Sequence, residues 1–302
     1  MEKLYEPLIW IVIPTRNRSA DLIDCIKSVK NLNYINKRIV VVDNNSDDDT
    51  VNQLSNIYPE IDLLILEKNF GASFATNLGI KFALKNNAEF VLRLDSDTIL
   101  DENYLSILIK PIQFDSEVGV VSGTIYYYDQ PEKIWFTGGY LKKWDLNIKF
   151  LSYNNNQILN NSDLIEVDLV PSTGMLISKK TIEDLNGFDE DYLVYYEDFD
   201  FCLRTKKSGK RILFVPEAKM WHKIYSNKKT FWTAKNWNRS KMIYYRKHAN
   251  NWFHLLFLIC YAFLYSVFRG IIPKEDRGNR GPLLPTMYGL LQGLFQKLNF
   301  RS

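Results

Sequence analysis

The chain has 302 residues, 46% of them hydrophobic and 24% charged, so it is long enough to bury a large core, and this composition argues against long disordered spans. Its three cysteines, at positions 25, 202 and 260, show no short paired spacing, which argues against a zinc ribbon or a disulfide framework and favours a reducing compartment. The net charge of +3 is unevenly distributed: residues 218–302 hold 15 Lys and Arg against two acids, a net +13, which leaves −10 for the other 217 residues.

Strand-like and helix-like segments alternate over the first hundred residues. Apolar runs followed by polar loops predict four buried parallel strands, at 8–14, 38–42, 62–66 and 90–94. Amphipathic spacing at 21–29 and 72–85 predicts helices between them, and the polar loop 43–49 opens a further helix. This order indicates an α/β fold, a Rossmann-like nucleotide-binding sheet with helices on both faces, whose ligands bind at the carboxyl ends of the strands.

The pattern changes after the fourth strand. Aromatic, β-branched and Asn-rich stretches between about 117 and 170 predict extra strands and loops. We then expect a strand at 175–177 followed by a helix, a helix at 197–207 and a strand at 211–215. The sequence therefore predicts one domain over 1–225, with a nucleotide-binding half at 1–100 and an acceptor and catalytic half at 101–225.

Residues 226–302 form a basic and apolar C-terminal segment. The apolar run 255–268 has 14 residues, which is short for a membrane-spanning helix of about 20, and 283–298 has apolar residues at roughly helical spacing. Cations lie between the two runs, at Lys274, Arg277 and Arg280. This pattern predicts a helix pair on a membrane surface, and a packed helical hairpin or a homodimer interface is the alternative. Because the N-terminus lacks a signal-peptide pattern, we expect a cytoplasmic protein, peripheral or monotopic on the inner face of the cell membrane.

An acidic pair, Asp95-Ser96-Asp97, directly follows the fourth predicted strand. Transfer of a sugar from a nucleoside diphosphate leaves growing negative charge on the diphosphate, which a divalent cation can neutralise. Hard cations prefer carboxylate oxygens, so such a pair can offer one carboxylate to the metal and one to the ribose or to a metal-bound water. Alone, two acids after a strand are often only a turn or a helix cap.

Polar residues after the other strands support the same site. Asp43 can accept hydrogen bonds from a pyrimidine N–H or a ribose hydroxyl, and Arg16 can reach a base or a phosphate. Gly71 can let a ligand approach the backbone closely. Each of these alone could be an ordinary loop residue. Together they predict a nucleotide site made of Pro14, Thr15, Arg16, Asp43, Asn69, Gly71, Asp95 and Ser96.

Three acids lie within four residues at the start of the predicted helix 197–207. Acids at a helix N-terminus are favoured by the helix dipole alone, but mutual repulsion raises at least one pKa, which suits a general base. Further along, His222 follows the strand-like run 211–215 and is a candidate metal ligand, although a lone histidine beside a tryptophan is more often an ordinary, partly buried residue.

Seven motifs, in this order, resemble those of glycosyltransferase family 2, with the closer likeness to its bacterial and archaeal rhamnosyltransferase-like branch. They are IVIPTRNR at 11–18, VVDNNS at 41–46, NxGxxxAxNxG at 69–79, DSD at 95–97, GMLI at 174–177, GFDE at 187–190 and EDxDxxLR at 197–204. The resemblance covers about residues 8–225, and the C-terminal segment lies outside it.

The resemblance implies a GT-A fold, an inverting mechanism and Mg²⁺ or Mn²⁺ as cofactor. It implies that Asp43 contacts the nucleoside, that Asp97 binds metal with Asp95 near the ribose, and that Asp198 is the catalytic base. His222 matches the family's late histidine near the metal. Trp135, with Gly138 and Gly139, matches a WxxGG stretch near donor or acceptor sugar. We assign to the sugars the motif residues Trp135, Gly174, Glu197 and Arg204.

The residue pattern and the resemblance together imply an inverting, metal-dependent glycosyltransferase. The donor would be a UDP- or dTDP-linked hexose or deoxyhexose, with rhamnose among the candidates, and the acceptor a hydroxyl of a glycan or a polyprenyl-linked glycan. A sugar nucleotidyltransferase would need a Gly-rich basic loop after the first strand, which the sequence lacks. A donor-binding pseudoenzyme stays open as an alternative. A nucleic-acid binder could use the basic stretch 223–247 but would leave the carboxylates unexplained, so we expect no nucleic-acid partner.

Overall fold

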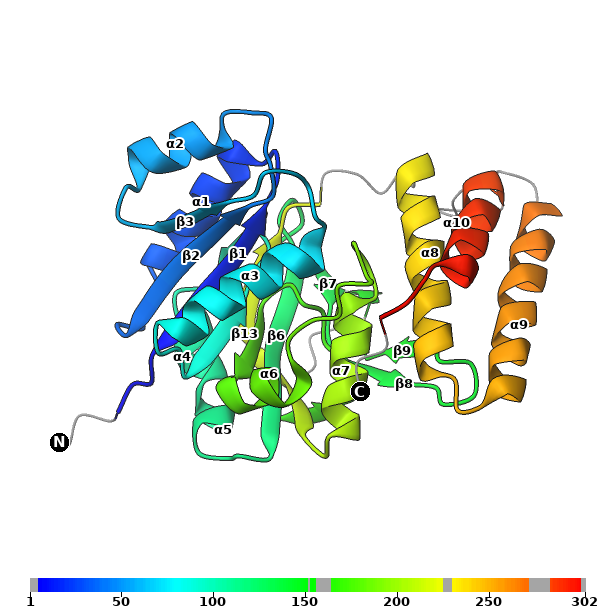
Figure 1. Ribbon diagram of the computed structural model, residues 1–302. Coiled ribbons are helices and arrows are strands. Elements are labelled where there is room, and N and C mark those ends of the chain that lie inside the picture. The colour runs from blue at the N-terminus through cyan, green and yellow to red at the C-terminus, as the bar shows by residue number, and fades with distance from the viewer. Residues whose placement is uncertain (1–4, 152, 156–163, 225–229, 272–282, 300–302) are drawn as a thin grey trace.

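The computed structural model describes residues 5–151, 153–155, 164–224, 230–271 and 283–299 (Figure 1). Lys274, Arg277 and Arg280, the cations expected at the membrane surface, lie outside the described residues. A central sheet of 11 strands fills one part of the molecule, and three C-terminal helices stand side by side on the right of Figure 1.

The first half of the sheet is parallel, as the sequence predicts. Its strands lie in the order β3-β2-β1-β4. Their bounds are β1 Ile9–Thr15, β2 Lys37–Asp43, β3 Asp62–Ile65 and β4 Phe90–Arg93. The connecting helices are α1 Ser19–Lys30, α2 Thr50–Ile57 and α3 Ala72–Lys85. Because all four strands point the same way, their polar carboxyl ends meet at one edge of the sheet.

The second half of the sheet is mixed, which differs from the simple parallel sheet that the first strands predict. β12 (Met175–Ser178) runs antiparallel between β4 and β6 (Val118–Tyr127), and β13 (Arg211–His222) pairs in parallel with β6. The other strands are β5 Thr98–Leu100, β7 Ile134–Phe136, β10 Tyr153–Asn155 and β11 Ile165–Val167, with a separate hairpin of β8 Gly139–Leu141 and β9 Ile148–Phe150. The short helices are α4 Tyr104–Leu108, α5 Lys110–Gln113 and α6 Lys179–Leu185.

β13 extends seven residues beyond its predicted end at 215. A register shift between Val215 and Lys219 accommodates Pro216, after which pairing with β6 resumes. The strand therefore delivers His222 to the same region as the end of β4.

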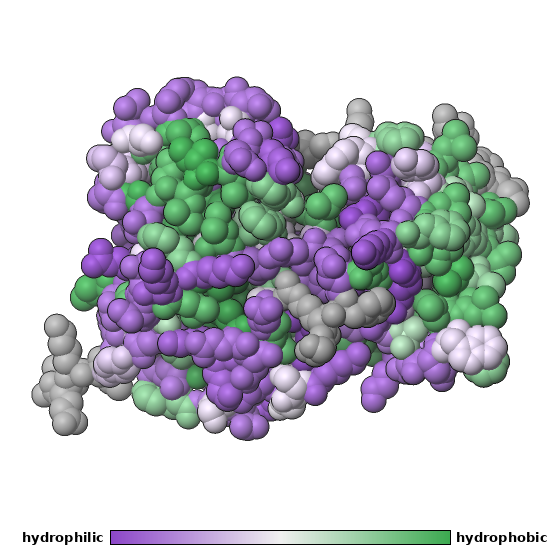
Figure 2. Space-filling model, viewed as in Figure 1, coloured by the Kyte–Doolittle hydropathy of each residue, from purple (hydrophilic) through white to green (hydrophobic). Residues whose placement is uncertain are grey.

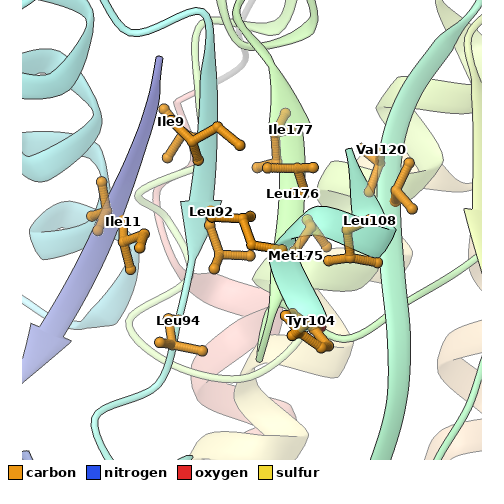
Figure 3. Close-up of a cluster of buried hydrophobic side chains, with 14 of the residues drawn as sticks. Ile9, Ile11, Leu92, Leu94, Tyr104, Leu108, Val120, Met175, Leu176 and Ile177 are labelled. Carbon is orange, nitrogen blue, oxygen red and sulfur yellow. The ribbon is translucent and has the colours of Figure 1, made fainter. Parts of the chain in front are cut away.

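The main core lies between the sheet and its helices. Figure 3 shows side chains from β1, β4, β12 and α4 packed into one cluster, among them Ile11, Leu92, Leu108 and Leu176, all fully buried. Full burial of such a side chain contributes about 1.5–3 kcal/mol, so this core holds the strand ends in fixed positions.

The C-terminal segment packs on the second half of the preceding chain, next to residues 192–203. Its helices are α8 Phe231–His248, α9 Trp252–Ile271 and α10 Leu283–Phe295. A Cβ on Gly289 would lie 2.1 Å from the Lys235 carbonyl oxygen, and one on Gly293 would lie 2.3 Å from that of Arg239, so these glycines let α10 and α8 approach closely. A second core cluster joins residues of all three helices to Tyr192 and Tyr196, next to α7 (Glu197–Lys207).

Candidate active site

Three possible metal ligands converge where two strands end. Asp95 and Asp97 follow β4, and His222 is the last residue of β13. One ligand atom from each lies within 4.8 Å of the other two, and His222 Nε2 is 3.1 Å from Asp97 Oδ1. Two carboxylates and an imidazole form a donor set that suits Mn²⁺ or, with bound waters, Mg²⁺. These residues therefore fit the divalent cation that the sequence implies.

Asp95 is held in place by partners on both carboxylate oxygens. The Arg93 guanidinium donates to Oδ1, and the Thr173 hydroxyl donates to Oδ2. Burial alone would raise the pKa of Asp95, but Arg93, His222 and the Thr173 hydrogen bond outweigh burial and hold the pKa below its ordinary value. Asp95 is therefore an oriented carboxylate at neutral pH.

His222 lies between Asp97 and an aromatic side chain. The Trp135 ring contacts the imidazole edge-to-face, with a centroid separation of 4.7 Å. Burial would lower the pKa of His222, but the hydrogen bond and charge of Asp97, with the charge of Asp95, outweigh burial and raise it. Trp135 thus borders the metal cluster, and its contact with a sugar stays a prediction.

Asp198 lies in the first turn of α7. Its Oδ1 accepts a hydrogen bond of 2.9 Å from the Phe199 backbone N–H, and the Ser172 backbone N–H also donates to the carboxylate. Burial raises the pKa of Asp198 despite these hydrogen bonds and despite the nearby positive charge of Arg93. A carboxylate with a raised pKa is a better proton acceptor, as a general base requires.

The segment 171–174 connects the proposed metal ligands to the proposed base. Its Ser172 backbone N–H binds Asp198, while the next residue, Thr173, binds Asp95 through its hydroxyl. Arg93 acts on both groups, since it pairs with Asp95 and its charge lowers the pKa of Asp198. Asp95 and Asp198, which are 103 residues apart in the sequence, are therefore joined through two consecutive residues.

Glu197, beside the half-buried Asp198, is buried, with 9% of its surface exposed. Burial, and then the charge of Asp198, raise its pKa, which favours the protonated acid. Its Oε2 atom has no hydrogen-bond partner among the residues that the structure describes. Since an unpaired buried oxygen costs about 1–3 kcal/mol, a ligand hydroxyl at this position would remove that cost.

The remaining predicted nucleotide residues lie at the carboxyl ends of β1 to β4. In the β1–β2 pairing, Thr15 is opposite Asp43. The Asp43 carboxylate accepts from the Ser46 backbone N–H at 2.9 Å, and the Arg16 guanidinium lies 3.0 Å from Asp47. These contacts shape the two loops, and contact with a nucleotide stays a prediction for the whole set, which is Pro14, Thr15, Arg16, Asp43, Asn69, Gly71, Asp95 and Ser96.

The two glycines in the predicted site are required by the packing and backbone conformation of the protein itself. Gly71 has a φ of +93°, and a Cβ there would lie 2.8 Å from the Leu193 carbonyl oxygen, so the close neighbour is protein backbone rather than the expected ligand. Gly174 has a φ of +76°, and its Cβ would lie 2.4 Å from the Met220 sulfur, inside the core. The packing of Gly174 is structural, and its contact with a sugar stays a prediction.

Arg204 is engaged inside the protein. Its Nε is 2.7 Å from Asp200, and its two terminal nitrogens donate to the carbonyls of Leu185 and Gly187, each at 3.0 Å. These bonds attach α7 to the turn after α6. They give Arg204 a structural role, and its contact with a sugar stays a prediction.

A family model described as glycosyl transferase family 2 matches residues 10–185, which is more than half of the chain. The chain belongs to glycosyl transferase family 2. It is therefore a glycosyltransferase enzyme of the α/β class.

Curated relatives of this glycosyltransferase are distant. It is 25% identical to a dTDP-rhamnosyl transferase, RfbF of Shigella flexneri, over 72% of this chain and 69% of that protein, which confirms the likeness to rhamnosyltransferases. It is 25% identical to a probable glycosyltransferase, YdaM of Bacillus subtilis, over 82% of this chain and 59% of that protein. It is 24% identical to the poly-beta-1,6-N-acetyl-D-glucosamine synthase of Staphylococcus aureus, over 70% of this chain and only 49% of the synthase.

Solved structures support the fold. The crystal structure of GalNAc-T7 with UDP, GalNAc and Mn²⁺ matches 92% of this glycosyltransferase and 54% of that chain, with a TM-score of 0.64 and 16% identity. Staphylococcus aureus TarS matches 90% of this chain and 47% of its own, with a TM-score of 0.54 and 16% identity. At such identities the likeness shows a GT-A-like fold and no more.

Sequence patterns did not find several residues of this glycosyltransferase site. Arg93 is a lone charge in an apolar strand, and at 4% exposure it is buried beside Asp95. That isolated charge was the available signal, because a buried arginine needs an acidic partner. Thr173, which binds Asp95, gave no comparable signal. Arg18, 3.5 Å from Asp97, ends the IVIPTRNR motif, but the motif alone did not indicate this contact.

Proposed function

We propose that the protein is an inverting, metal-dependent glycosyltransferase that moves a hexose or deoxyhexose from a UDP- or dTDP-linked donor to a hydroxyl of a glycan or polyprenyl-linked glycan. The observation that carries this proposal is the convergence of Asp95, Asp97 and His222 within 4.8 Å. The names of two related proteins agree with it, since one relative is a dTDP-rhamnosyl transferase and the GalNAc-T7 structure holds UDP and Mn²⁺.

Asp97 and His222 would hold the Mg²⁺ or Mn²⁺, with Asp95 beside them on the ribose side. A divalent cation supplies Lewis-acid stabilisation of the leaving diphosphate. Arg93 and Thr173 keep the Asp95 carboxylate in one orientation, which lowers the cost of organising the site when the donor binds. Arg18, which lies between Asp21 and Asp97, adds positive charge close to the same carboxylates.

Asp198 takes the proton of the acceptor hydroxyl, and the oxygen attacks the anomeric carbon on the face opposite the leaving diphosphate. Attack from that face inverts the anomeric configuration. Glu197, protonated because its pKa is raised, can donate a hydrogen bond to a sugar hydroxyl. The Ser172 N–H and the Phe199 N–H orient the Asp198 carboxylate for this transfer.

The first prediction concerns metal-dependent binding. In calorimetric titrations, Mn²⁺ should strengthen UDP or dTDP binding to the wild-type protein, and Asp97→Asn should weaken that metal-dependent binding by at least about tenfold, since a ligating carboxylate is removed. Asp129→Asn, at an exposed turn after β6, is the matched control and should bind as the wild type does. Equal binding by Asp97→Asn and the control would remove Asp97 from the metal site.

The C-terminal helices present a large apolar surface, seen as the green region on the right of Figure 2. Its most exposed members on α9 are Leu264 and Phe268, at 70% and 67%, and on α10 Leu284 and Phe295, at 80% and 79%. Among the described residues, none of the helices is both long and apolar enough to cross a bilayer. We infer that this face lies on the cytoplasmic surface of the membrane, where a polyprenyl-linked acceptor would be held.

A flotation assay tests the membrane proposal. The wild-type protein should float with phosphatidylglycerol vesicles, whereas a Leu264→Ser, Leu284→Ser, Phe295→Ser triple variant should stay in solution, because burying each apolar side chain contributes about 1.5–3 kcal/mol. Phe114→Ser, at a side chain 77% exposed beyond α5, is the control and should float. If the triple variant still floats, and sedimentation shows a dimer for the wild-type protein but a monomer for the variant, the face is a homodimer interface.

A further inference from the structure

A cluster of aromatic side chains lies beside the proposed base. Tyr195, three residues before Asp198, contacts two tryptophans of α8: its ring centroid is 6.3 Å from that of Trp232 and 5.4 Å from that of Trp237. The buried Tyr196 packs against these residues, with its ring centroid 5.1 Å from that of Trp237. We call Tyr195, Trp232 and Trp237 the aromatic cluster. Both tryptophans lie outside the matched family model, which ends at residue 185.

The loop that carries Tyr195 also contacts the loop after β3, which belongs to the proposed nucleotide site. The Ala72 backbone N–H donates to the Leu193 carbonyl at 2.7 Å, and Gly71 packs against the same residue. Tyr195 and Tyr196 both have positive φ, 64° and 67°, a backbone conformation that bulky residues rarely adopt. The chain thus holds two tyrosines in an unfavourable backbone conformation between the loop after β3 and the start of α7.

The two tryptophans of the cluster are exposed although they are large aromatic side chains, and Tyr195 is half-buried. Trp232 is 55% exposed and Trp237 is 37% exposed, whereas Tyr196, which packs against Trp237, is buried. Glu197 is close to the cluster, since it directly follows Tyr196 at the start of α7, and Phe199 of the same helix turn contacts Trp237 with a centroid separation of 6.4 Å. The cluster therefore combines open aromatic surface with a neighbouring buried carboxyl oxygen, Glu197 Oε2, that has no partner among the described residues.

We propose that Tyr195, Trp232 and Trp237 form the subsite that stacks a pyranose ring of the acceptor, with its hydroxyl directed to Glu197 and Asp198. This inference rests on the proposed transferase function and names the part of the chain that selects the acceptor.

The chemistry of a sugar ring matches this surface. One face of a pyranose presents C–H groups, which are apolar and slightly positive, and an aromatic face is negative, so the two stack favourably. The hydroxyls at the ring edge need hydrogen-bond partners, which carboxyl oxygens provide. A lipid surface would use the aromatic rings but would leave Glu197 Oε2 unpaired, and the large apolar face of α9 and α10 is a separate set of residues.

The test uses the full-length enzyme, a nucleoside diphosphate sugar that it consumes, and methyl glycosides of glucose, galactose, rhamnose and N-acetylglucosamine as acceptor probes. Trp232→Ala and Trp237→Ala should each raise the acceptor KM about tenfold or more, with the main effect on acceptor KM rather than on donor KM. Trp237→Phe keeps an aromatic face and should recover most of the loss. Circular dichroism would identify a variant that fails to fold.

Trp144→Ala is the matched control, since Trp144 is 58% exposed and contacts Phe257 of α9, but it lies outside the aromatic cluster. It should leave the acceptor KM unchanged. If the cluster variants transfer to the same probes with the wild-type KM, or lose vesicle flotation while keeping that KM, the inference is overturned. If the wild-type protein releases no nucleoside diphosphate from any donor, the proposed function fails instead.

Discussion

Asp198→Asn should lower the rate of sugar transfer by about 10²–10⁴-fold while UDP or dTDP still binds in the presence of Mn²⁺. Asparagine has nearly the same shape and keeps an oxygen that can accept the Phe199 N–H, so the start of α7 should hold its conformation. What it loses is the ability to take a proton. Asp184→Asn, at an exposed pair with Lys180 on α6, serves as the control and should transfer at the wild-type rate.

The same base predicts a pH dependence. Burial raises the pKa of Asp198 to about 6, so the carboxylate form, which acts as base, is lost as the pH falls through that value. The wild-type kcat/KM should therefore decline below about pH 6, well above the range of an ordinary aspartate. A collapse of nucleotide binding in Asp198→Asn, or a rate that stays flat down to pH 4, would contradict the assignment of Asp198.

Lys247→Met should destabilise the whole protein by roughly 3–5 kcal/mol, because it leaves two buried carboxylates without their cation. Lys247 Nζ lies 2.5 Å from Asp189 and 2.6 Å from Asp191, and all three side chains are at most 7% exposed. Urea unfolding followed by circular dichroism would measure the loss. Lys235→Met, on the same helix, removes a cation–π contact with the Tyr288 ring, with no ion pair among the described residues, and should change stability by less than about 1 kcal/mol. Equal midpoints for the two variants would contradict the prediction.

This ion pair shows why the C-terminal segment is more than an appendage to residues 1–225. Lys247 pairs with the loop that precedes α7, and His248 Nε2 is 2.7 Å from Asp200, two residues after the proposed base. Removal of residues 226–302 would take Lys247 away from Asp189 and Asp191 and His248 away from Asp200. Point variants of the exposed face therefore test membrane binding more cleanly than a truncation would.

The first four strands could be predicted from sequence because each is an apolar run followed by polar residues. β1, β2, β3 and β4 begin and end within one residue of the expected bounds, and the helix 72–85 was predicted without error. Parallel strands buried on both faces give this uninterrupted apolar signal. β13 gave a weaker sequence signal, because Pro216 interrupts its apolar pattern. Pairing with β6, which the sequence does not show, continues this strand to His222.

The basic stretch 223–247 could not be interpreted from sequence, because charge count does not show what a side chain contacts. Lys223 pairs with Asp21 and Asp24, and Arg246 donates to the carbonyls of Gly293 and Gln296. Lys223 thus joins the chain after β13 to α1, and Arg246 joins α8 to the end of α10. Long-range contacts of this kind, like the one between Thr173 and Asp95, depend on the completed fold.

The central claim is that this protein binds a nucleoside diphosphate through a metal ion at the carboxyl ends of its parallel strands. The most direct measurement is the thermal unfolding midpoint with UDP, dTDP, GDP and CDP, each with and without Mn²⁺, because a ligand that binds the native state raises the midpoint. We expect UDP or dTDP to raise it, and only when Mn²⁺ is present. A midpoint that no diphosphate raises in the presence of Mn²⁺, or that rises equally without metal, would contradict the account.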